Sequence, residues 1–331
     1  MKKTKLEAGR VVVIGGGSWG GALADQLQKS EHKVTVLTRR QETTDALNQG
    51  KILALPGLKL KQPISSTIQP ECLTSASLII IAVPLSATAI TIQMVRSYAS
   101  KKAIILFTGK GLLPHPRKGG IFLPEWVEES FDEFNAYGIL SGPSFADEVI
   151  SDKPAAVMIA SHSVSLSTQI ADYFSSSCLR CYVGDDIVGV AVGGAIKNII
   201  AIAAGIATGL ELGDNARAAL VTRGLAEITR LAVKIGGKTK TLNGLAGIGD
   251  LMLSCSGPHS RNMAYGISLA RKQKPDNRLA EGSKAASLLN LRAHYEFIEL
   301  PIAQSVGRIL LHPDTIEKEI NLLLARAVNL E

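Results

Sequence analysis

Three glycines near the start of the chain have a spacing that suits phosphate binding. Gly15, Gly17 and Gly20 fit the pattern G-x-G-x-x-G. The apolar run 11–14 directly precedes them, and a helical pattern follows from Gly21. In such a turn the glycines allow a tight bend, let the backbone approach a pyrophosphate and let the helix pack closely on the strand. The N-terminus of the helix also attracts an anion. This order of strand, turn and helix predicts a dinucleotide-binding site, with a purely structural glycine turn as the alternative.

Two arginines follow the second apolar run. Arg39 and Arg40 come after residues 34–38 (VTVLT), where a site selective for NAD usually has an Asp or Glu that binds the ribose 2′-hydroxyl. An arginine at this place can neutralise a 2′-phosphate or stack on adenine. The pair therefore favours NADP, with NADPH as the preferred reduced form, or the use of both NADP and NAD. A solvent-facing arginine pair without a role is the alternative.

A lysine interrupts the most apolar segment of the chain. Lys197 lies in residues 193–198 (GGAIKN), inside a long run of Ala, Ile, Val and Gly. Burial favours the neutral amine, so a lysine in this setting can accept a proton near neutral pH and return it in the reverse direction. We interpret Lys197 as a candidate general acid and base.

Two further clusters combine charge with glycine or with a helix start. Asp250 follows two glycines in LAGIGD, and residues 259–262 (HSRN) indicate a helix with Ser260 as its N-cap. A helix N-terminus that carries an arginine, here Arg261, suits a phosphate group. For Lys197, Asp250 and Arg261 alike, an internal salt bridge or a side chain that reaches to solvent is the alternative.

Two loops follow predicted strands. Lys110, in the sequence TGKG, comes after the apolar run 103–107, and Gly142 and Ser144 come after the run that ends at Ser141. The carboxyl ends of parallel strands form the ligand-binding edge of such sheets. We therefore expect both loops at equivalent places on that edge and count Lys110, Gly142 and Ser144 among the candidate binding residues.

Length and composition exclude several classes of protein. Of the 331 residues, 46% are hydrophobic and 20% are charged, which excludes a disordered chain. The 36 Lys and Arg residues against 29 Asp and Glu residues give a net charge of +7, but the basic residues form short groups without interleaved aromatic residues. We therefore predict a small-molecule substrate and no nucleic acid as partner. No metal is expected, because the CxxC pair Cys178 and Cys181 has no second pair to complete a site.

The elements that position these residues fall into two sets. Seven apolar runs have the character of strands: 10–14, 33–38, 77–83, 103–107, 136–141, 155–160 and 179–183. Helical patterns lie at 18–29, 86–98, 122–130 and 164–175, and residues 113–120 (LPHPRKGG) have the composition of a loop. After residue 185 only helical patterns remain. We predict an α/β fold, with a Rossmann-type doubly wound parallel sheet over residues 1–185 and an all-α substrate and catalytic domain over residues 186–331.

One segment is long and apolar enough to span a membrane. Residues 187–212 carry Lys197 and Asn198 in their middle, together with many Gly and Ala residues. We therefore interpret the segment as a buried helix of a soluble domain. The apolar run 11–14 is too short for a signal peptide, so we expect a cytoplasmic protein without membrane insertion.

Eight motifs follow one another along nearly the whole chain. They are GGGSWGGAL (15–23), FTGKG (107–111), GPSFADEV (142–149), GGAIKN (193–198), GDNARAALVTRG (213–224), GLAGIGDL (244–251), SRN (260–262) and Glu281-Gly282. Together they resemble the bacterial NAD(P)-dependent sn-glycerol-3-phosphate dehydrogenases. The resemblance implies a cytoplasmic homodimer that interconverts dihydroxyacetone phosphate and sn-glycerol 3-phosphate with NADP or NAD and so supplies glycerol phosphate for phospholipid synthesis.

The resemblance also implies roles for individual residues. The cofactor would be held by the glycine turn and by Ser18, Trp19, Arg39, Arg40, Lys110, Ala146, Arg261, Leu279 and Glu281. The substrate would contact Lys110, Gly142, Ser144, Lys197, Asp250, Ser260, Arg261 and Asn262. Lys197 would act as the general acid and base, and Asp250 would orient it.

Three alternatives belong to other classes of protein. A catalytically silent dinucleotide-binding sensor would keep the glycine turn but would have no need of Lys197. A membrane protein would use residues 187–212 as its span. A two-domain dehydrogenase acting on a hydroxy acid or a sugar acid would need a carboxylate-binding group where we expect Arg261 to bind phosphate.

Overall fold

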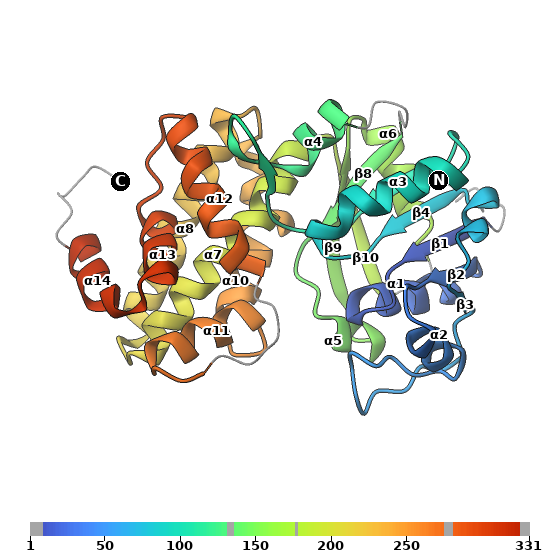
Figure 1. Cartoon of the computed structure of the whole chain (residues 1–331), viewed down its shortest axis with the longest axis horizontal. Coiled ribbons are helices and arrows are strands. Elements are labelled where there is room, and N and C mark those ends of the chain that lie inside the picture. Colours follow the sequence, from blue (N-terminus) through green and yellow to red (C-terminus); the bar gives the residue numbers. More distant parts are fainter. Residues whose placement is uncertain (1–8, 131–135, 176–177, 275–280, 325–331) are drawn as a thin grey trace. The chain divides into compact units, whose positions relative to one another are not determined.

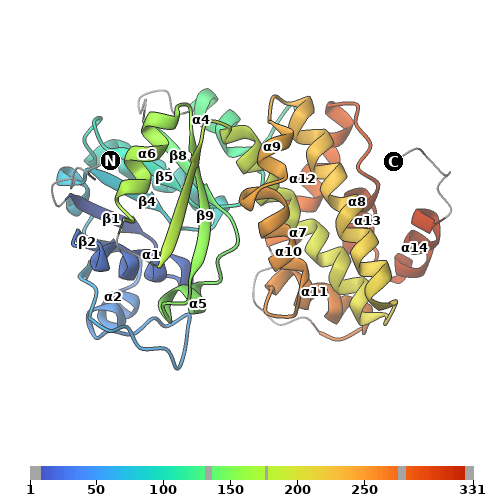
Figure 2. The same ribbon diagram turned by 180° about the vertical axis from the view of Figure 1, so that it is seen from behind.

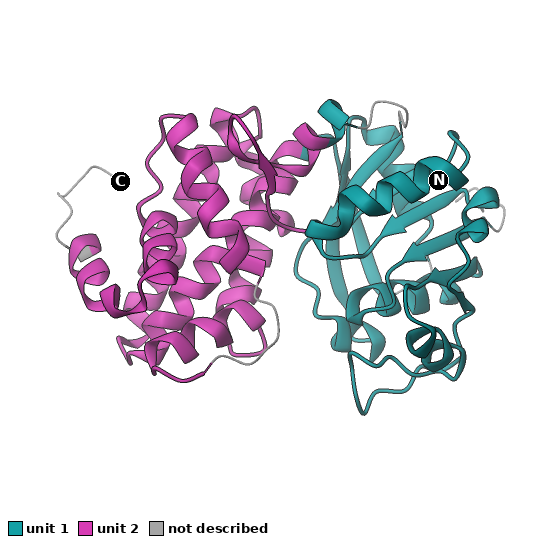
Figure 3. Ribbon diagram, in the orientation of Figure 1, with its two compact units in different colours: residues 1–109, 127–187 teal, residues 110–126, 188–331 magenta. Residues whose placement is uncertain are grey.

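The computed structural model describes residues 9–130, 136–175, 178–274 and 281–324 (Figure 1). The chain forms two compact units: Met1–Gly109 with Val127–Ile187 make up unit 1, and Lys110–Trp126 with Val188–Glu331 make up unit 2 (Figure 3). The sequence pattern predicts one boundary, after residue 185. The structure differs, because residues 110–126 pack with the helices of unit 2 and the chain leaves unit 1 for good after Ile187.

Unit 1 is built on a sheet whose strands follow the spatial order β10-β9-β8-β5-β4-β1-β2-β3 among the described residues. Their bounds are β1 (Arg10–Ile14), β2 (Lys33–Leu37), β3 (Ser66–Thr67), β4 (Leu78–Ile81), β5 (Ile104–Phe107), β8 (Tyr137–Ser141), β9 (Ala155–Ser161) and β10 (Leu179–Gly184). The seven predicted strands are all present, with ends that differ by up to two residues. The two-residue strand β3 was not predicted, because it has no apolar run of its own.

The sheet is mostly parallel, with one departure from the predicted arrangement. β9 runs antiparallel to β8, with Gly138 opposite Ser161 and Ser141 opposite Met158, and β10 then pairs parallel to β9. The connection between β8 and β9 contains only the short helix α5 (Ala146–Ile150). Parallel neighbours need a crossover that covers a face of the sheet, and this connection returns the chain directly instead.

The carboxyl ends of the parallel strands meet at one edge of the sheet. The ladder places Ile14 of β1 beside Ile81 of β4, Ile81 beside Phe107 of β5, and Phe107 beside Ile139 of β8. The residues that follow these strands, Gly15, Gly109 and Gly142, therefore lie along the same edge, as the sequence predicted for the loops after β5 and β8.

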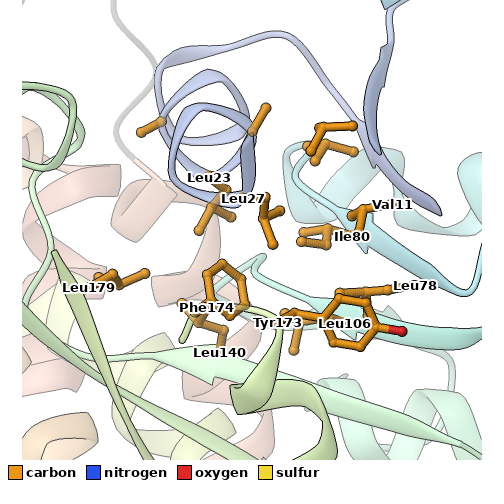
Figure 4. Packing of buried hydrophobic residues seen from close by; sticks show 14 of the residues in the cluster. Val11, Leu23, Leu27, Leu78, Ile80, Leu106, Leu140, Tyr173, Phe174 and Leu179 are labelled. Carbon is orange, nitrogen blue, oxygen red and sulfur yellow. The ribbon is translucent and has the colours of Figure 1, made fainter. Parts of the chain in front are cut away.

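The core of unit 1 explains why its strands appear in the sequence as continuous apolar runs. Helices cover both faces of a parallel sheet, so successive side chains are buried on opposite faces. Figure 4 shows Leu23 and Leu27 of helix α1 (Ser18–Lys29) packed over Ile80 of β4 in one cluster of buried side chains. Each such side chain contributes about 1.5–3 kcal/mol of transfer free energy when fully buried.

The remaining helices of unit 1 are α2 (Gln41–Asn48), α3 (Thr88–Tyr98), part of α4 (Leu123–Ser130), and α6 (Val164–Asp172). Four helices, α1, α3, α4 and α6, match the predicted helical patterns. Helices α2 and α5 are not among the predicted helical patterns. Both are short, and α2 (QETTDALN) is polar apart from two residues, so its helical period is weak.

The described residues of unit 2 form helices and a hairpin, seen from opposite sides in Figures 1 and 2. The helices are α7 (Ile187–Gly209), α8 (Gly213–Lys234), α9 (Thr239–Leu242), α10 (Asp250–Cys255), α11 (Arg261–Ala270), α12 (Glu281–Tyr295), α13 (Pro301–Leu311) and α14 (Ile316–Leu324). Within the described residues, α7 alone is long and apolar enough to cross a membrane, yet 89% of its most apolar window is buried in the protein. This agrees with the interpretation of α7 as a core helix.

The predicted loop 113–120 is instead an antiparallel hairpin. Strands β6 (Leu113–His115) and β7 (Gly119–Ile121) pair with Leu113 opposite Ile121. The sequence hides the hairpin because a proline and two glycines occupy its short strands, and both residue types are rare in strands. A Cβ atom on Gly119 would stand 2.2 Å from the Cβ of Leu291 in α12, so the glycine permits a close contact that holds the hairpin on unit 2.

Candidate active site

The glycine turn of unit 1 has the geometry that a dinucleotide site requires. Gly15 has a φ of +112°, which favours glycine, and a Cβ atom on Gly20 would stand 1.9 Å from the carbonyl oxygen of Gly15. A Cβ atom on Gly17, by contrast, would have no heavy atom within 4 Å. Gly15 thus makes the bend after β1, and Gly20 lets α1 pack closely against the backbone of Gly15. At Gly17 the backbone at the start of the helix is open, which fits a pyrophosphate.

The other predicted cofactor residues of unit 1 lie around the same edge. Ser18 and Trp19 are the first two residues of α1, after Gly17 as its N-cap. Arg39 and Arg40 are exposed directly after β2, and the carbonyl oxygen of Arg40 accepts the first hydrogen bonds of α2. Both guanidinium groups are therefore accessible to a ligand.

Unit 1 also holds the second set of predicted ligand residues at this edge. Gly142 has a φ of +127°, and the hydroxyl of Ser144 donates to the Gly142 carbonyl oxygen at 3.1 Å. Ala146 begins α5 and is half-buried. The turn at Gly142 is thus fixed by its glycine and by the Ser144 hydroxyl.

In unit 2, three predicted residues form one buried cluster of charges. The ammonium group of Lys197 donates to Oδ1 of Asp250, and the ammonium group of Lys110 donates to Oδ2 of Asp250 at 2.6 Å. The Lys197 amine also donates to the hydroxyl of Ser254 at 2.9 Å. The side chains of Lys197 and Asp250 are only 9% and 2% exposed, whereas that of Lys110 is 20% exposed. The internal salt bridge considered for Lys197 and Asp250 is therefore present, as part of this cluster.

Close backbone packing brings Lys197 to Asp250. A Cβ atom on Gly193 in α7 would stand 2.6 Å from the carbonyl oxygen of Ala246, so only glycine lets α7 approach this closely. Lys197 is four residues after Gly193 and therefore lies on the same face of α7. Ala246 belongs to a π-helical turn, Leu245–Gly249, that leads directly into Asp250 at the start of α10.

Ser254 is not among the site residues predicted from sequence. It lies four residues after Asp250 in α10, on the same helix face, and is 5% exposed. That spacing was a usable signal, because a buried hydroxyl one turn from a buried carboxylate can share its partner.

Burial and the neighbouring charges set the protonation states of the cluster. Burial favours the neutral amine of Lys197 and outweighs the attraction of Asp250, and Lys110 adds repulsion, so the pKa of Lys197 falls from 10.5 to about 8. Burial alone would raise the pKa of Asp250, but Lys110 and Lys197 together hold that pKa below its usual range. The cluster therefore combines a stable carboxylate with an amine that exchanges a proton close to neutral pH.

The third predicted group lies at the start of α11. Ser260 is the N-cap, as predicted, and its hydroxyl oxygen accepts from the backbone N–H of Met263 at 3.4 Å. Arg261 is exposed in the first turn. The side-chain oxygen of Asn262 accepts from the backbone N–H of Gly282 at 3.0 Å. Asn262 thus ties α11 to α12.

The same contact brings the start of α12 near the lysine-bearing helix. A Cβ atom on Gly282 would stand 2.6 Å from the carbonyl oxygen of Asn198, the residue after Lys197. Glu281 is the first residue of α12 and is half-buried. Leu279, also predicted to contact the cofactor, lies outside the described residues.

None of the cysteines belongs to these groups, although Cys255 directly follows Ser254 in α10. Cys72, Cys178, Cys181 and Cys255 are all free thiols. Burial raises the pKa of Cys181 and of Cys255 to about 12, so neither is a thiolate at neutral pH. Within the described part of the chain, no group of three or more His, Cys, Asp and Glu residues could hold a metal ion.

Two family models match the amino-acid sequence of the chain, one after the other along its length. Residues 10–167 match the N-terminal domain, and residues 186–321 the C-terminal domain, of NAD-dependent glycerol-3-phosphate dehydrogenase. The glycine turn lies in the first match and the Lys197–Asp250 pair in the second. Together the two matches cover most of the chain.

Individual proteins agree with the family models. The glycerol-3-phosphate dehydrogenases [NAD(P)+] of Macrococcus caseolyticus and Mesorhizobium japonicum are 39% and 37% identical to this chain, over 96% and 97% of it and 98% and 94% of their own lengths. The crystal structure of glycerol-3-phosphate dehydrogenase from Coxiella burnetii superposes with a TM-score of 0.88 at 33% identity, over 96% of this chain and 99% of that one. The chain therefore belongs to the NAD-dependent glycerol-3-phosphate dehydrogenase family.

Proposed function

We propose that this chain interconverts dihydroxyacetone phosphate and sn-glycerol 3-phosphate with NAD(P)H, and that Lys197 exchanges the proton. The chain is an oxidoreductase of a family named for this reaction. The observation that carries the residue assignment is the buried cluster of Lys197, Asp250 and Lys110. A silent dinucleotide sensor would have no use for a buried lysine whose pKa is lowered to about 8.

Gly17 and the start of α1 would hold the cofactor's pyrophosphate, because the backbone there is open and the helix N-terminus favours an anion. Arg39, exposed after β2, would face the adenosine ribose, and its positive charge favours the 2′-phosphate of NADPH. When bound, the nicotinamide supplies the hydride. Arg40, Ala146, Glu281 and Leu279 stay predicted cofactor contacts.

Lys197 would deliver the proton of the reduction. Its protonated amine donates to the carbonyl oxygen of dihydroxyacetone phosphate as negative charge develops there, and the resulting neutral amine takes the proton back in the oxidation of glycerol 3-phosphate. Asp250 holds the amine in place through its Oδ1 atom, and Ser254 supplies a second acceptor. Lys110, on Oδ2 of Asp250, adds positive charge beside the developing oxyanion.

Arg261 would bind the substrate phosphate. It is exposed in the first turn of α11, where the helix dipole adds to its own charge, and a guanidinium can give two hydrogen bonds to phosphate oxygens. The same group is also predicted to touch the cofactor. Gly142, Ser144, Ser260 and Asn262 stay predicted substrate contacts, Asn262 with its side-chain oxygen already engaged by Gly282.

The cellular setting is part of the proposal. We infer a cytoplasmic homodimer that supplies glycerol phosphate for phospholipid synthesis, without nucleic acid as partner. The burial of the apolar helix α7 as a core helix supports the absence of membrane insertion. Size measurement of the purified protein in detergent-free buffer tests the dimer and the solubility together.

A spectrophotometric assay tests the activity directly. NADPH and NADH oxidation is followed with dihydroxyacetone phosphate, and with 2-oxo acids as the substrates of the competing hypothesis. We expect turnover with dihydroxyacetone phosphate, a larger kcat/KM for NADPH, and no more than slow turnover of 2-oxo acids. Faster turnover of a 2-oxo acid would replace the proposal with a hydroxy-acid dehydrogenase.

A further inference from the structure

One segment of unit 2 has, apart from Lys110 at its start, no role in the proposed chemistry. We name residues 110–126 the strap: they leave unit 1 at Lys110, form the β6–β7 hairpin, and return through the first residues of α4. Leu113 pairs with Ile121 in the antiparallel ladder, so the residues before Leu113 and those after Ile121 leave the hairpin at the same end. Lys110 and Glu125 therefore belong to the same, open end of the strap.

Arg292 of α12 binds Glu125 at that end of the strap, and we name these two residues the clamp. The guanidinium is 2% exposed and gives two hydrogen bonds to the Glu125 carboxylate, from Nη1 to Oε2 at 3.0 Å and from Nη2 to Oε1 at 2.8 Å. Nη1 also donates to the carbonyl oxygen of Gly120 in β7 at 3.1 Å. Glu125 in turn accepts from the backbone N–H of Phe122 at 3.0 Å. One arginine thus ties together both the returning strand and the start of α4.

The fit between the strap and α12 leaves little room for movement. A Cβ atom on Gly120 would stand 2.9 Å from the Cβ of Leu288, one helical turn before Arg292. Lys118 adds a second cation on Glu125, from Nζ to Oε1 at 3.1 Å. The strap is therefore docked on α12 by close packing and by an ion-pair network of which Arg292 is the buried member.

The other strand of the strap ends at the catalytic cluster. Lys110 gives its hydrogen bond to Asp250, and the next residue, Gly111, has a φ of +136° that few side chains tolerate. Leu112 and Leu113 are buried immediately afterwards. The β6–β7 ladder, the buried Leu112 and Leu113, and the turn at Gly111 therefore connect the clamp to Lys110.

We propose that Arg292 and Glu125 are positioning residues that hold Lys110 against Asp250. The inference rests on the proposed function, in which Lys110 and Asp250 serve the proton transfer of Lys197. Neither Arg292 nor Glu125 touches the cluster, so their effect on the reaction passes through the strap. Loss of the clamp should let Lys110 leave Asp250 while Lys197 keeps its own contact.

Displacement of Lys110 has a distinctive consequence for pH dependence. Within the described part of the chain, the charged groups that set the pKa of Lys197 are Asp250 from α10 and Lys110 from the strap, and the nearby thiol of Cys255 stays protonated. Repulsion from Lys110 lowers the pKa of Lys197, so release of Lys110 should raise that pKa. The alkaline limb of the reduction profile should then move to higher pH, which a general loss of stability would not cause.

Kinetics of Glu125→Gln and Arg292→Lys test the clamp. Glu319→Gln is the matched control, because Glu319 forms a two-point ion pair with Arg308 between α13 and α14 of the same unit, away from the strap. We expect both clamp variants to lower kcat at least tenfold and to shift the alkaline limb to higher pH, and we expect the same of Lys110→Met. Glu319→Gln should keep the parent's profile. In the Lys110→Met background, Glu125→Gln should change kcat less than twofold, since the contact it maintains is already gone.

Chemical labelling gives a readout that needs no activity. Competitive acetylation of lysines, followed by mass spectrometry, compares Lys110 with the exposed Lys153 as internal reference. We expect Lys110 to be labelled faster in Glu125→Gln and Arg292→Lys, approaching the rate in Asp250→Asn, and at the parent rate in Glu319→Gln. Parent-like Lys110 labelling in folded clamp variants would overturn the positioning role even if Lys197 proves essential. Full activity of Lys197→Ala would instead overturn the proposed function, whatever the labelling shows.

Discussion

Lys197 and Asp250 form an ion pair inside unit 2 whose two side chains are only 9% and 2% exposed. A buried pair is costly to form and still more costly to break, because removal of one partner leaves the other charge without compensation. Here Asp250 has a second cation, Lys110, on its other oxygen. The carboxylate therefore stays paired when Lys197 gives up a proton, and the cluster can cycle between two charge states without an isolated buried charge.

Replacement of Lys197 should affect proton transfer to the substrate but not the binding of NADPH. We expect Lys197→Ala to lower kcat by ~10²-fold or more, the contribution of a positioned general acid. The dissociation constant for NADPH should change little, because the glycine turn that we propose as the pyrophosphate site belongs to the other unit. Steady-state kinetics and fluorescence titration with NADPH measure the two effects. Turnover within tenfold of the parent would remove Lys197 from the mechanism.

The pH dependence should report the amine of Lys197. Reduction needs the protonated amine, so its rate should fall as pH rises through about 8, and oxidation should rise over the same range. For stability the sign follows from the lowered pKa, because between pH 8 and 10.5 the unfolded chain binds the proton and the folded chain does not. This group alone should therefore make the protein more stable as pH rises across that window. Rate profiles for both directions, and urea titrations of the parent and of Lys197→Met, check the two signs.

Much of unit 1 could be predicted from sequence because its signals are local. Apolar runs of four to seven residues mark the strands, and the glycines fix the turn after β1. Strand direction is not a local property, and the antiparallel β9 shows that burial alone does not reveal it. The β6–β7 hairpin was missed for a related reason, since its glycines are stabilised by contact with Leu288 and Leu291, more than a hundred residues away.

The site was predictable as a set of residue types but not as a set of contacts. An apolar helix with one lysine indicated a functional amine at Lys197. The pairing of Lys110 with Asp250 joins residues 140 positions apart, and no periodicity or spacing encodes such a contact. Arg292 escaped notice as well, because an arginine near the end of a helix is usually a solvated side chain.

An added methyl group should have different effects at two glycines of the turn after β1. It should lower the stability of the protein at Gly20 and the affinity for NADPH at Gly17. Gly20→Ala places a Cβ atom 1.9 Å from the Gly15 carbonyl oxygen, so it should destabilise the protein by ~1–3 kcal/mol as an overpacked site. Gly17→Ala meets no atom within 4 Å and should leave stability within ~0.5 kcal/mol of the parent. It should weaken NADPH binding, because the added methyl group would occupy the position that we propose for the pyrophosphate. Urea unfolding and NADPH titration distinguish the effects, and equal losses of stability would contradict this description of the turn.

Arg39 should govern the choice between the two cofactors. Arg39→Asp turns an attraction for the 2′-phosphate into a repulsion, so we expect KM for NADPH to rise far more than KM for NADH. Lys101→Asp, at an exposed cation of unit 1 that is not a predicted ligand contact, is the control for a general change of surface charge. An equal loss for both cofactors in Arg39→Asp would show that Arg39 stacks on adenine or supports the fold.

Arg261 should carry the phosphate end of the substrate. Arg261→Gln removes a cation from the first turn of α11, so KM for dihydroxyacetone phosphate should rise steeply. kcat should fall as well if the binding energy of the phosphate places the carbonyl for hydride transfer. Lys284→Gln, a substitution of another cation in the first turn of a helix of the same unit, controls for the loss of one positive charge.

A substrate without its phosphate gives an independent test of Arg261. Glycolaldehyde keeps the carbonyl and one hydroxyl, and added phosphite or sulfate can occupy the phosphate position. In the parent the anion should stimulate glycolaldehyde reduction, because its binding energy is then available to organise the site. In Arg261→Gln the stimulation should be much smaller at the same anion concentration. Stimulation of equal size in both proteins, together with an unchanged KM for dihydroxyacetone phosphate, would move the phosphate away from Arg261, with Lys110 as the next candidate for its binding.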